Sequence, residues 1–260
     1  MDAPKKVEAG DITSRSRAIH KPGIYTILPK GNRVPSTLPM FEGTISQVLT
    51  SPVLGARFTE HELHVQPNGG SRGMIDDGLE AFLFVLDGGF ELEVEGKKHS
   101  MGEGGFFWLP PNMPYSLKNK GESLTRALWL RKRYEPLDGI ALPDPIIANE
   151  KDVEPIPEDT YYERHLIPYD DELGFDMAFN LLLFTPGIYF SLVECHVMEH
   201  GLYMLAGRGI YHLNGDFIEV EKDDYIYMAP YCPQTFHATG WDGSSYLLYK
   251  DANRDYIAGL

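Results

Sequence analysis

Short apolar runs alternate with turn-forming residues along most of the chain. The apolar positions seldom recur at the three- and four-residue spacing of an amphipathic helix, and the runs end at Gly, Pro, Asn or Asp. The predicted strands are Phe82–Leu86, Phe90–Val94, Phe106–Leu109, Leu124–Leu130, Met177–Phe184, Tyr189–Val197, Tyr203–Leu205, Ile210–Leu213, Tyr225–Met228 and Ser245–Tyr249. Many short strands between tight turns predict an all-β barrel or sandwich.

The second half of the chain repeats the turn and strand pattern of the first half. At a shift of 119 positions, Gly88 falls on Gly207 and Pro114 falls on Pro233. The segment WLPPNMPYS falls on YMAPYCPQT at the same shift. A single shift that aligns turns and strands over about 65 residues predicts two copies of one β-module.

The repeat divides the chain into four parts. Residues 1–50 form an N-terminal arm, which we expect to add strands to a sheet edge, and residues 51–134 form the first module. Residues 135–160 are a linker with five prolines, and residues 161–260 form the second module. Because proline lacks a backbone donor and has a fixed φ, the linker should contain neither a central strand nor a regular helix.

Composition narrows the classes of partner. The charged residues are 38 Asp plus Glu and 23 Lys plus Arg, a net charge of −15, and phosphate backbones repel so acidic a chain. No apolar run approaches the roughly 20 residues that span a bilayer, and the N-terminus lacks the apolar core of a signal peptide. Two cysteines are too few for a disulfide framework. We therefore expect a cytoplasmic protein that binds neither nucleic acid nor membrane.

Candidate chemistry gathers in the second module. Residues two apart on a strand share a face, so Glu194 and His196 should project together, with His200 just beyond. Gln234 follows a strand and a tight turn, and the interior of a small barrel could bring all four residues to one point. Two imidazoles, a carboxylate and an amide suit Mn²⁺, Fe²⁺ or Ni²⁺. A structural zinc site is a poorer match because thiolates are absent from this set.

Neighbouring polar residues receive structural interpretations. We expect Cys195 to be a small packed residue, Cys232 a turn residue and Glu199 an outward-pointing side chain. The remaining histidines should be ordinary polar or solvated positions, namely His20, His61, His64, His99, His165, His212 and His237.

The first module lacks the same donors. At the shift of 119, the four candidate ligands correspond to Ile75, Asp77, Ala81 and Tyr115. Only Asp77 could bind a metal, and one carboxylate does not make a site. We therefore expect a metal-free first module that packs against the second and covers sheet edges, with a separate ligand pocket left open as an alternative.

The segments Glu194–His200 and Ala229–Gln234 match the positions of the two motifs of the cupin superfamily. Most cupins have two histidines one residue apart, then a glutamate, and a further histidine in the second motif. Here Glu194 takes the place of the first histidine, His200 that of the glutamate and Gln234 that of the last histidine. This permutation, in a chain of two modules, resembles the (S)-ureidoglycine aminohydrolase family, whose bacterial members were described as glyoxylate-induced proteins. The likeness extends to Glu172–Met177 and to the C-terminal run YLLYKDANRD.

The resemblance implies a bicupin fold of two jelly-roll barrels and one Mn²⁺ per chain, in the C-terminal barrel. It implies that the metal ligands are Glu194, His196, His200 and Gln234. It further implies that Glu194, Gln234, Tyr211, Tyr246 and Lys250 bind the substrate, and that Glu194, Tyr246 and Lys250 take part in catalysis. The family reaction hydrolyses (S)-ureidoglycine to (S)-ureidoglycolate and ammonia in purine (allantoin and allantoate) catabolism, and a homo-oligomer is implied as well.

Two other classes of function remain open on the sequence. One is a cupin dioxygenase or isomerase that acts on a small organic acid, and oxygen consumption would distinguish a dioxygenase. The other is a bicupin that binds a small ligand without catalysis, and such a protein would not need Lys250 and Tyr246 beside a metal.

Overall fold

The computed structural model describes residues 16–255, which form strands and three short 3-10 helices. The first module contains β5 (Phe58–Ser71), β6 (Glu80–Asp87), β7 (Gly89–Val94), β8 (Lys97–Gly102), β9 (Gly105–Leu109), β10 (Tyr115–Lys118) and β11 (Thr125–Lys132). The second contains β15 (Met177–Phe184), β16 (His200–Ala206), β17 (Arg208–Leu213), β18 (Asp216–Glu221), β19 (Tyr225–Met228), β20 (Gln234–Thr239) and β21 (Ser244–Asp251). No helix in this part of the chain is long and apolar enough to cross a membrane.

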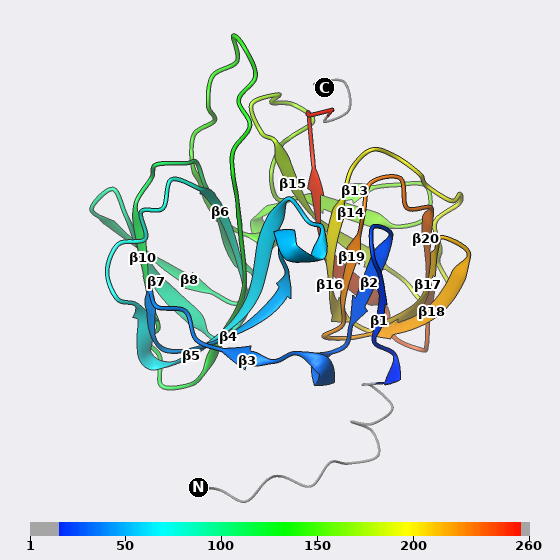
Figure 1. The fold of residues 1–260 in the computed structure, drawn as a ribbon, viewed down its shortest axis with the longest axis horizontal. Helices are drawn as coiled ribbons and strands as arrows, with labels where there is room; N and C mark the ends of the chain where they lie inside the picture. The colour runs from blue at the N-terminus through cyan, green and yellow to red at the C-terminus, as the bar shows by residue number, and fades with distance from the viewer. Residues whose placement is uncertain (1–15, 256–260) are drawn as a thin grey trace, which may run out of the picture.

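The strands confirm the internal repeat and the all-β fold. Strands β7, β8 and β11 coincide residue for residue with β17, β18 and β21 at the shift of 119. The pairings of β6 with β9 and β11, and of β7 with β8 and β10, recur as β16 with β19 and β21, and β17 with β18 and β20. Figure 1 shows the two groups of strands side by side.

The arm and the linker add strands to both modules. The outer strands are β1 (Ile19–Lys21), β2 (Tyr25–Leu28), β3 (Pro35–Ser36), β4 (Phe41–Thr50), β12 (Ile146–Asn149), β13 (Ile156–Pro157) and β14 (Tyr162–His165). Strands β1 and β2 extend the second module beside β19, whereas β3 and β4 join β5 of the first (Figure 1). The linker strand β12 pairs only with β9, at the edge of its sheet, and β13 ends the other sheet. The 3-10 helices span Lys30–Asn32, Pro52–Leu54 and Glu150–Asp152.

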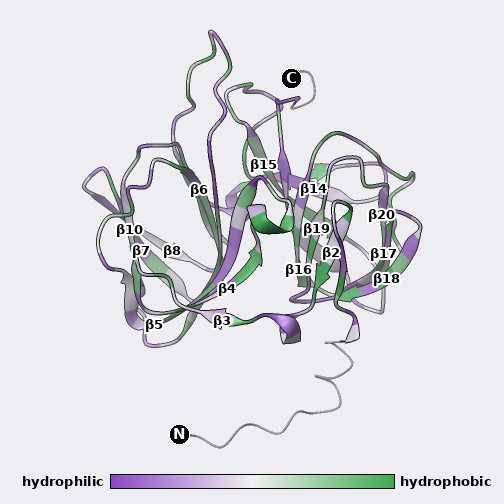
Figure 2. Cartoon of the chain, in the orientation of Figure 1, coloured by the Kyte–Doolittle hydropathy of each residue, from purple (hydrophilic) through white to green (hydrophobic). Residues whose placement is uncertain are grey.

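Three apolar cores hold the molecule together. One lies within each module, and the third lies between them and draws residues from both. Strand β21 serves two of these cores, because Tyr246 and Leu248 face the interior of the second module, whereas Leu247 and Tyr249 face the core between the modules. Hydrophobic and hydrophilic stretches accordingly occur side by side along the strands in Figure 2.

The predicted strand Tyr189–Val197 is wrong. Only two isolated bridges form there, between Tyr189 and His237 and between Glu194 and Gln234. One edge of strand β20 forms a continuous ladder with β17. The segment Tyr189–Val197 lies along the other edge of β20 and pairs with it only at these two bridges. Tyr189, Leu192 and Val193 therefore stay exposed, at 50%, 61% and 51%, whereas Phe190 packs against the core of the second module.

Candidate functional site

Backbone hydrogen bonds fix the predicted ligand positions. Glu194 N donates to Gln234 O at 2.8 Å, and Gln234 N donates to Glu194 O at 2.9 Å. His196 O accepts a 2.7 Å bond from the backbone N of Tyr231, which has a left-handed φ of 62° in the turn before β20. His200 begins β16, where it pairs with both β19 and β21. Residues that lie far apart in the chain therefore meet at one end of the second module.

The side chains converge on His196. Its ring centroid lies 4.9 Å from that of His200, and its Nε2 lies 3.5 Å from Gln234 Nε2 and 4.0 Å from Glu194 Oε2. Among residues 16–255, no three His, Cys, Asp or Glu side chains come together as a complete metal cluster. Glu194, His200 and Gln234 therefore each lie near His196, but the four side chains do not surround a single coordination point.

Both imidazoles are held in the neutral form. Burial is the main cause that lowers the pKa of His200 well below its ordinary value, and electrostatic interactions with His196 and Lys250 act in the same direction. Burial is also the main cause that lowers the pKa of His196. The Nδ1 atoms of both rings are buried without a hydrogen-bond partner. Because metal ions bind neutral imidazole, these two unsatisfied side chains and their carboxylate and amide neighbours suit a divalent cation.

Lys250 lies across the sheet from His200. The two residues are Cα partners in the β16–β21 ladder. Lys250 Nζ donates to Tyr169 Oη at 2.7 Å and lies 4.5 Å from the centroid of that ring. Within residues 16–255 no acidic side chain forms an ion pair with Lys250. A half-buried ammonium beside two neutral histidines can bind an anion.

Tyr246 and Tyr211 contribute buried aromatic rings to the core of the second module. Both are almost fully buried, at 1% and 2% exposure, and each ring lies 5.4 Å from that of Phe236. Burial raises the pKa of both phenols, so both remain protonated near neutral pH. Tyr246 and Lys250 pair with Leu182 and Ala178 of β15, which confirms that they lie on the same face of β21.

Sequence reasoning missed several polar residues around Lys250. Tyr169 holds its ammonium, and the buried Asn180 donates to the carboxylate of Glu163. His165, expected to be solvated, instead has Nε2 at 3.5 Å from Glu163 Oε1 and its ring at 5.2 Å from Tyr169. The single polar residue in the apolar run MAFNLLLF could have indicated Asn180, but nothing in the sequence singled out Tyr169.

The first module keeps the backbone of the site and fills it with other side chains. Ile75 and Tyr115 form the bridge equivalent to that of Glu194 and Gln234, with Ile75 N donating to Tyr115 O at 2.6 Å. Ile75, Tyr115 and Ala81 are all buried in the module's apolar core. Asp77 instead lies outside, where it pairs with Arg131 at 2.6 Å. The absence of metal from this module remains a prediction.

Three neighbours of the site differ from their predicted roles. Cys195 is exposed rather than packed, because its segment is not a strand. Cys232 follows the turn and is buried in the core of the second module. Glu199 points away from the barrel interior, but it is 1% exposed because the first module covers it.

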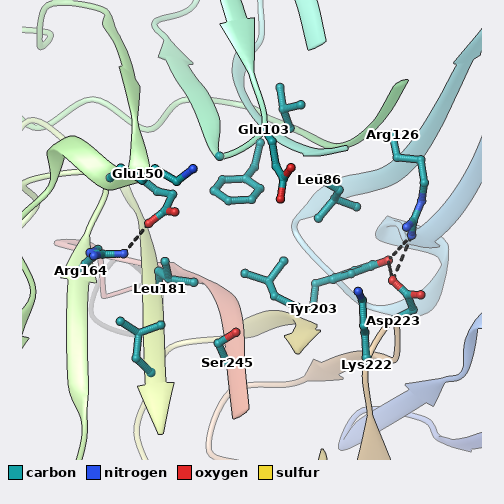
Figure 3. A pocket seen from close by; sticks show the side chains of 16 residues that line it. Leu86, Glu103, Arg126, Glu150, Arg164, Leu181, Tyr203, Lys222, Asp223 and Ser245 are labelled. Carbon is teal, nitrogen blue, oxygen red and sulfur yellow. Dashed lines mark hydrogen bonds and ion pairs between the residues drawn. The ribbon is translucent and has the colours of Figure 1, made fainter. Parts of the chain in front are cut away.

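A cavity of about 260 Å³ lies elsewhere, between the modules (Figure 3). Its lining includes Arg126, Arg164, Tyr203 and Asp223 but none of the predicted ligands. Arg164 is paired with Glu150, and Arg126 with Asp223, so these charges already have partners in the protein.

Comparisons with known proteins show what the whole chain is similar to. A family model described as a cupin domain matches residues 61–131. The (S)-ureidoglycine aminohydrolase of Escherichia coli is 35% identical over 92% of this chain and 93% of its own length. The chain belongs to the (S)-ureidoglycine aminohydrolase family. The Arabidopsis thaliana enzyme of that name is 31% identical over 94% of this chain and 81% of its own length.

Solved structures place this family member among the cupins. A glyoxylate-induced protein of Pseudomonas aeruginosa has a TM-score of 0.84 at 35% identity, over 92% of both chains. The Escherichia coli protein Ylba has a TM-score of 0.85 at 32% identity, over 96% of this chain and 99% of its own. Bacillus subtilis oxalate decarboxylase, at 11% identity and a TM-score of 0.67 over 88% of this chain and 77% of its own, shares the fold alone.

Proposed function

We propose that this protein hydrolyses (S)-ureidoglycine to (S)-ureidoglycolate and ammonia in purine catabolism. The observation that carries the proposal is the placement of Lys250 opposite His200 in the β16–β21 ladder, with the ring of His196 4.9 Å from that of His200. The site thus offers a cation and uncharged nitrogen donors to one small ligand. The names of relatives that match over nearly the whole chain support this substrate.

Mn²⁺ is the cofactor that we propose, bound once per chain in the second module. The unpartnered Nδ1 atoms and lowered pKa values of His196 and His200, with Glu194 and Gln234 nearby, support a divalent ion of borderline hardness. Bacillus subtilis oxalate decarboxylase, which shares the fold, has Mn(II) centres. When bound, the ion would supply a Lewis acid at which the substrate's carboxylate and a neighbouring heteroatom could be oriented.

Lys250 would bind the substrate carboxylate. Its hydrogen bond to Tyr169 directs the ammonium, and its position on β21 places it across from His200. A charge-assisted contact of this kind fixes the position of the substrate's carboxylate. Tyr246 and Tyr211, both protonated and buried, would form the wall that excludes water from the other side.

The reaction replaces a C–N bond with a C–O bond. Water adds its oxygen to the carbon, the C–N bond breaks, and a proton passes from water to the departing amine, so that ammonia leaves. Glu194 is the carboxylate nearest His196, and we assign it the transfer of this proton. Tyr246 and Lys250 would hold the substrate while it reacts.

The test uses purified protein loaded with Mn²⁺ and freshly generated ureidoglycine. We expect enzyme-dependent ammonia release and a product of a single hand, since the uncatalysed decay gives no such preference. Oxygen consumption without ammonia release would contradict the proposal and favour a dioxygenase. Binding without turnover would favour a non-catalytic protein.

The assembly and the domain limits belong to the same proposal. We propose a homo-oligomer that acts in the cytoplasm, with limits at residues 1–50, 51–134, 135–160 and 161–260. Light scattering of the purified protein measures the oligomeric state, and a monomer at working concentration would contradict it.

A further inference from the structure

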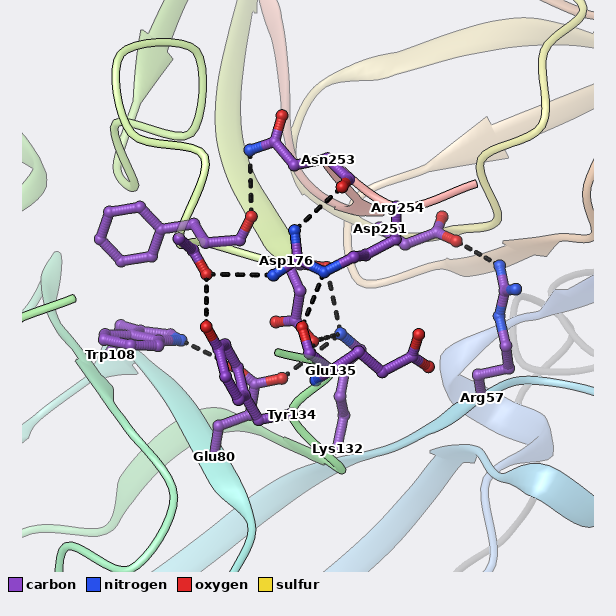
Figure 4. A network of polar contacts seen from close by, with 12 residues as sticks. Arg57, Glu80, Trp108, Lys132, Tyr134, Glu135, Asp176, Asp251, Asn253 and Arg254 are labelled. Carbon is purple, nitrogen blue, oxygen red and sulfur yellow. Dashed lines mark hydrogen bonds and ion pairs between the residues drawn. The ribbon is translucent and has the colours of Figure 1, made fainter. Parts of the chain in front are cut away.

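The two modules contact each other through two sets of polar side chains at equivalent positions of the repeat, and all of these side chains except Arg57 are buried. The equivalent residues, at the shift of 119, are Arg57 and Asp176, Glu80 and Glu199, and Lys132 and Asp251. Figure 4 shows members of both sets at the junction. In each set, a residue that precedes the first long strand of one module reaches across to the other module.

Arg57 of the first module reaches Glu199 and Asp251 of the second. Its backbone N donates to both carboxylate oxygens of Glu199, at 3.0 and 3.2 Å, and its Nε donates to Oε1 at 3.3 Å. A second arm of the guanidinium donates to Asp251 (Figure 4), whose other oxygen accepts a 2.7 Å bond from Glu199 N. Both acids are 1% exposed. Arg57 therefore ties the segment before β16 to the end of β21.

The residues that Arg57 ties are the immediate neighbours of the candidate site. Glu199 precedes His200, and Asp251 follows Lys250. Because successive side chains of a strand point to opposite faces, Arg57 acts on the back of the His200–Lys250 pair. The first module also packs closely here, since a Cβ on Gly201 would lie 2.9 Å from Glu60 Oε2.

The equivalent set, made of Asp176, Glu80 and Lys132, does not adjoin a candidate metal site. Asp176 of the second module reaches Lys132 of the first, with Nζ at 2.5 Å from Oδ2 and at 3.3 Å from Glu80 Oε1. The residues in front are Ala81 and Arg131, the counterparts of His200 and Lys250. The repeat thus supplies a second charged contact between the modules at equivalent positions, without the candidate ligands. Lys132 and Asp176 are almost fully buried, whereas the side chain of Arg57 is 30% exposed.

We propose that Arg57 is a positioning residue: the first module, through this side chain, holds His200 and Lys250 at the spacing that the second module's site requires. The inference rests on the proposed function. A guanidinium carries its donors in a rigid plane and can therefore fix two carboxylates relative to each other, whereas an ammonium such as that of Lys132 can contact two carboxylates without such a fixed donor geometry. Small displacements of groups that hold a metal or a substrate have large effects on binding and rate.

The test compares Arg57→Met with Asp176→Asn in the full chain. Mn²⁺ affinity is measured by titrating metal-free protein and following the electron paramagnetic resonance signal of free Mn²⁺, alongside kcat, KM and thermal unfolding. We expect Arg57→Met to weaken Mn²⁺ binding and lower kcat by roughly tenfold each. Asp176→Asn should lower the unfolding temperature but leave Mn²⁺ affinity and kcat within about twofold. Arg57→Lys should recover more of the unfolding temperature than of kcat.

A second matched pair serves if Arg57→Met does not fold. Glu199→Gln and Glu80→Gln are isosteric changes at equivalent positions, and only the first should weaken Mn²⁺ binding. Equal effects on metal affinity within either pair would overturn the inference while wild-type binding and turnover stand. Wild-type protein that neither binds Mn²⁺ nor releases ammonia would overturn the proposed function and this inference with it.

Discussion

His200 and Lys250 face each other directly across the β16–β21 ladder, one a neutral buried imidazole and the other a half-buried ammonium. Neither position depends on a loop, because both strands are paired on two sides. Groups on two central strands are held more rigidly than groups on loops, so these two positions are the most firmly fixed part of the site.

Replacement of His196 should remove the metal. His196 is the side chain to which Glu194, His200 and Gln234 all lie close, so His196→Ala takes away the common neighbour of the set. We expect wild-type protein to contain about one divalent ion per chain and the variant to contain almost none. Elemental analysis of the two purified proteins checks this, and stoichiometric metal in the variant would rule out the proposed ligand set.

Replacement of Asp77 should have little effect. Asp77 occupies the position in the first module equivalent to His196, but it lies outside the core and pairs with Arg131. Asp77→Ala should leave metal content and kcat/KM close to wild type, at a stability loss of about 1 kcal/mol or less. A large loss of metal in this variant would mean that the first module holds the ion.

Lys250→Met should weaken the enzyme without removing its metal. The change keeps much of the side-chain volume and removes the charge that faces the site. Loss of a charge-assisted substrate contact in a site that excludes water should lower kcat/KM by roughly 30- to 1,000-fold. The loss falls on KM if the contact is equal in ground and transition states, and on kcat if it tightens as ammonia leaves. Kinetics within twofold of wild type would return Lys250 to a structural role.

The free energy of unfolding should fall as pH rises through the titration of Glu60. Burial raises the pKa of Glu60 from its ordinary value of 4.5 to about 7, while its carboxylate accepts a 2.8 Å bond from Tyr225. The folded protein then binds more protons than the unfolded chain, so this group's stabilisation is complete below pH 4.5 and is lost as pH rises to about 7. Glu60→Gln should raise stability at pH 8 by on the order of 2 kcal/mol and flatten this dependence in urea unfolding.

Glu62 provides the control for that experiment, because its shift has the opposite sign. Although burial opposes ionisation, a hydrogen bond with His64 and the charges of Arg33 and Arg126 lower its pKa to about 2. Its stabilisation is present above pH 4.5 and is lost as pH falls toward 2. Glu62→Gln should therefore destabilise the protein at pH 8. An equal response of the two variants would contradict both assignments.

The parts of the fold that follow from local pattern were predictable from sequence. Met177–Phe184 and Tyr225–Met228 are strands with the predicted limits, because every residue of these two runs is buried except the half-buried Leu183. The shift of 119 positions predicted the relation between the modules, because glycine and proline mark the same turns in both copies. Turn residues impose the same backbone geometry wherever they recur.

Contacts between distant parts of the chain were not predictable. The segment Tyr189–Val197 has the composition of a strand, but it pairs with β20 at only two isolated bridges. Glu199 was predicted only to point outward, because no residue near it in the sequence indicates its contact with Arg57, which lies 142 positions away. Tyr169 reaches Lys250 across 81 positions in the same way. The hydrophobic and polar pattern of one segment does not show which distant segment will pack against it.

The bridge between Ile75 and Tyr115 shows that the backbone geometry of the site does not depend on the metal-binding side chains. The first module forms the same crossing of chain segments as the second, yet it does so around an isoleucine and a tyrosine. Because this backbone bridge forms around apolar side chains in the first module, it does not need a metal ion. Binding of the ion to the second module should therefore cause little change in backbone order. Chelation should then lower the unfolding temperature only by mass action, leaving a folded apoprotein that can be reloaded with different ions. The first module becomes, by the same logic, a scaffold into which a second site could be built by exchanging side chains alone.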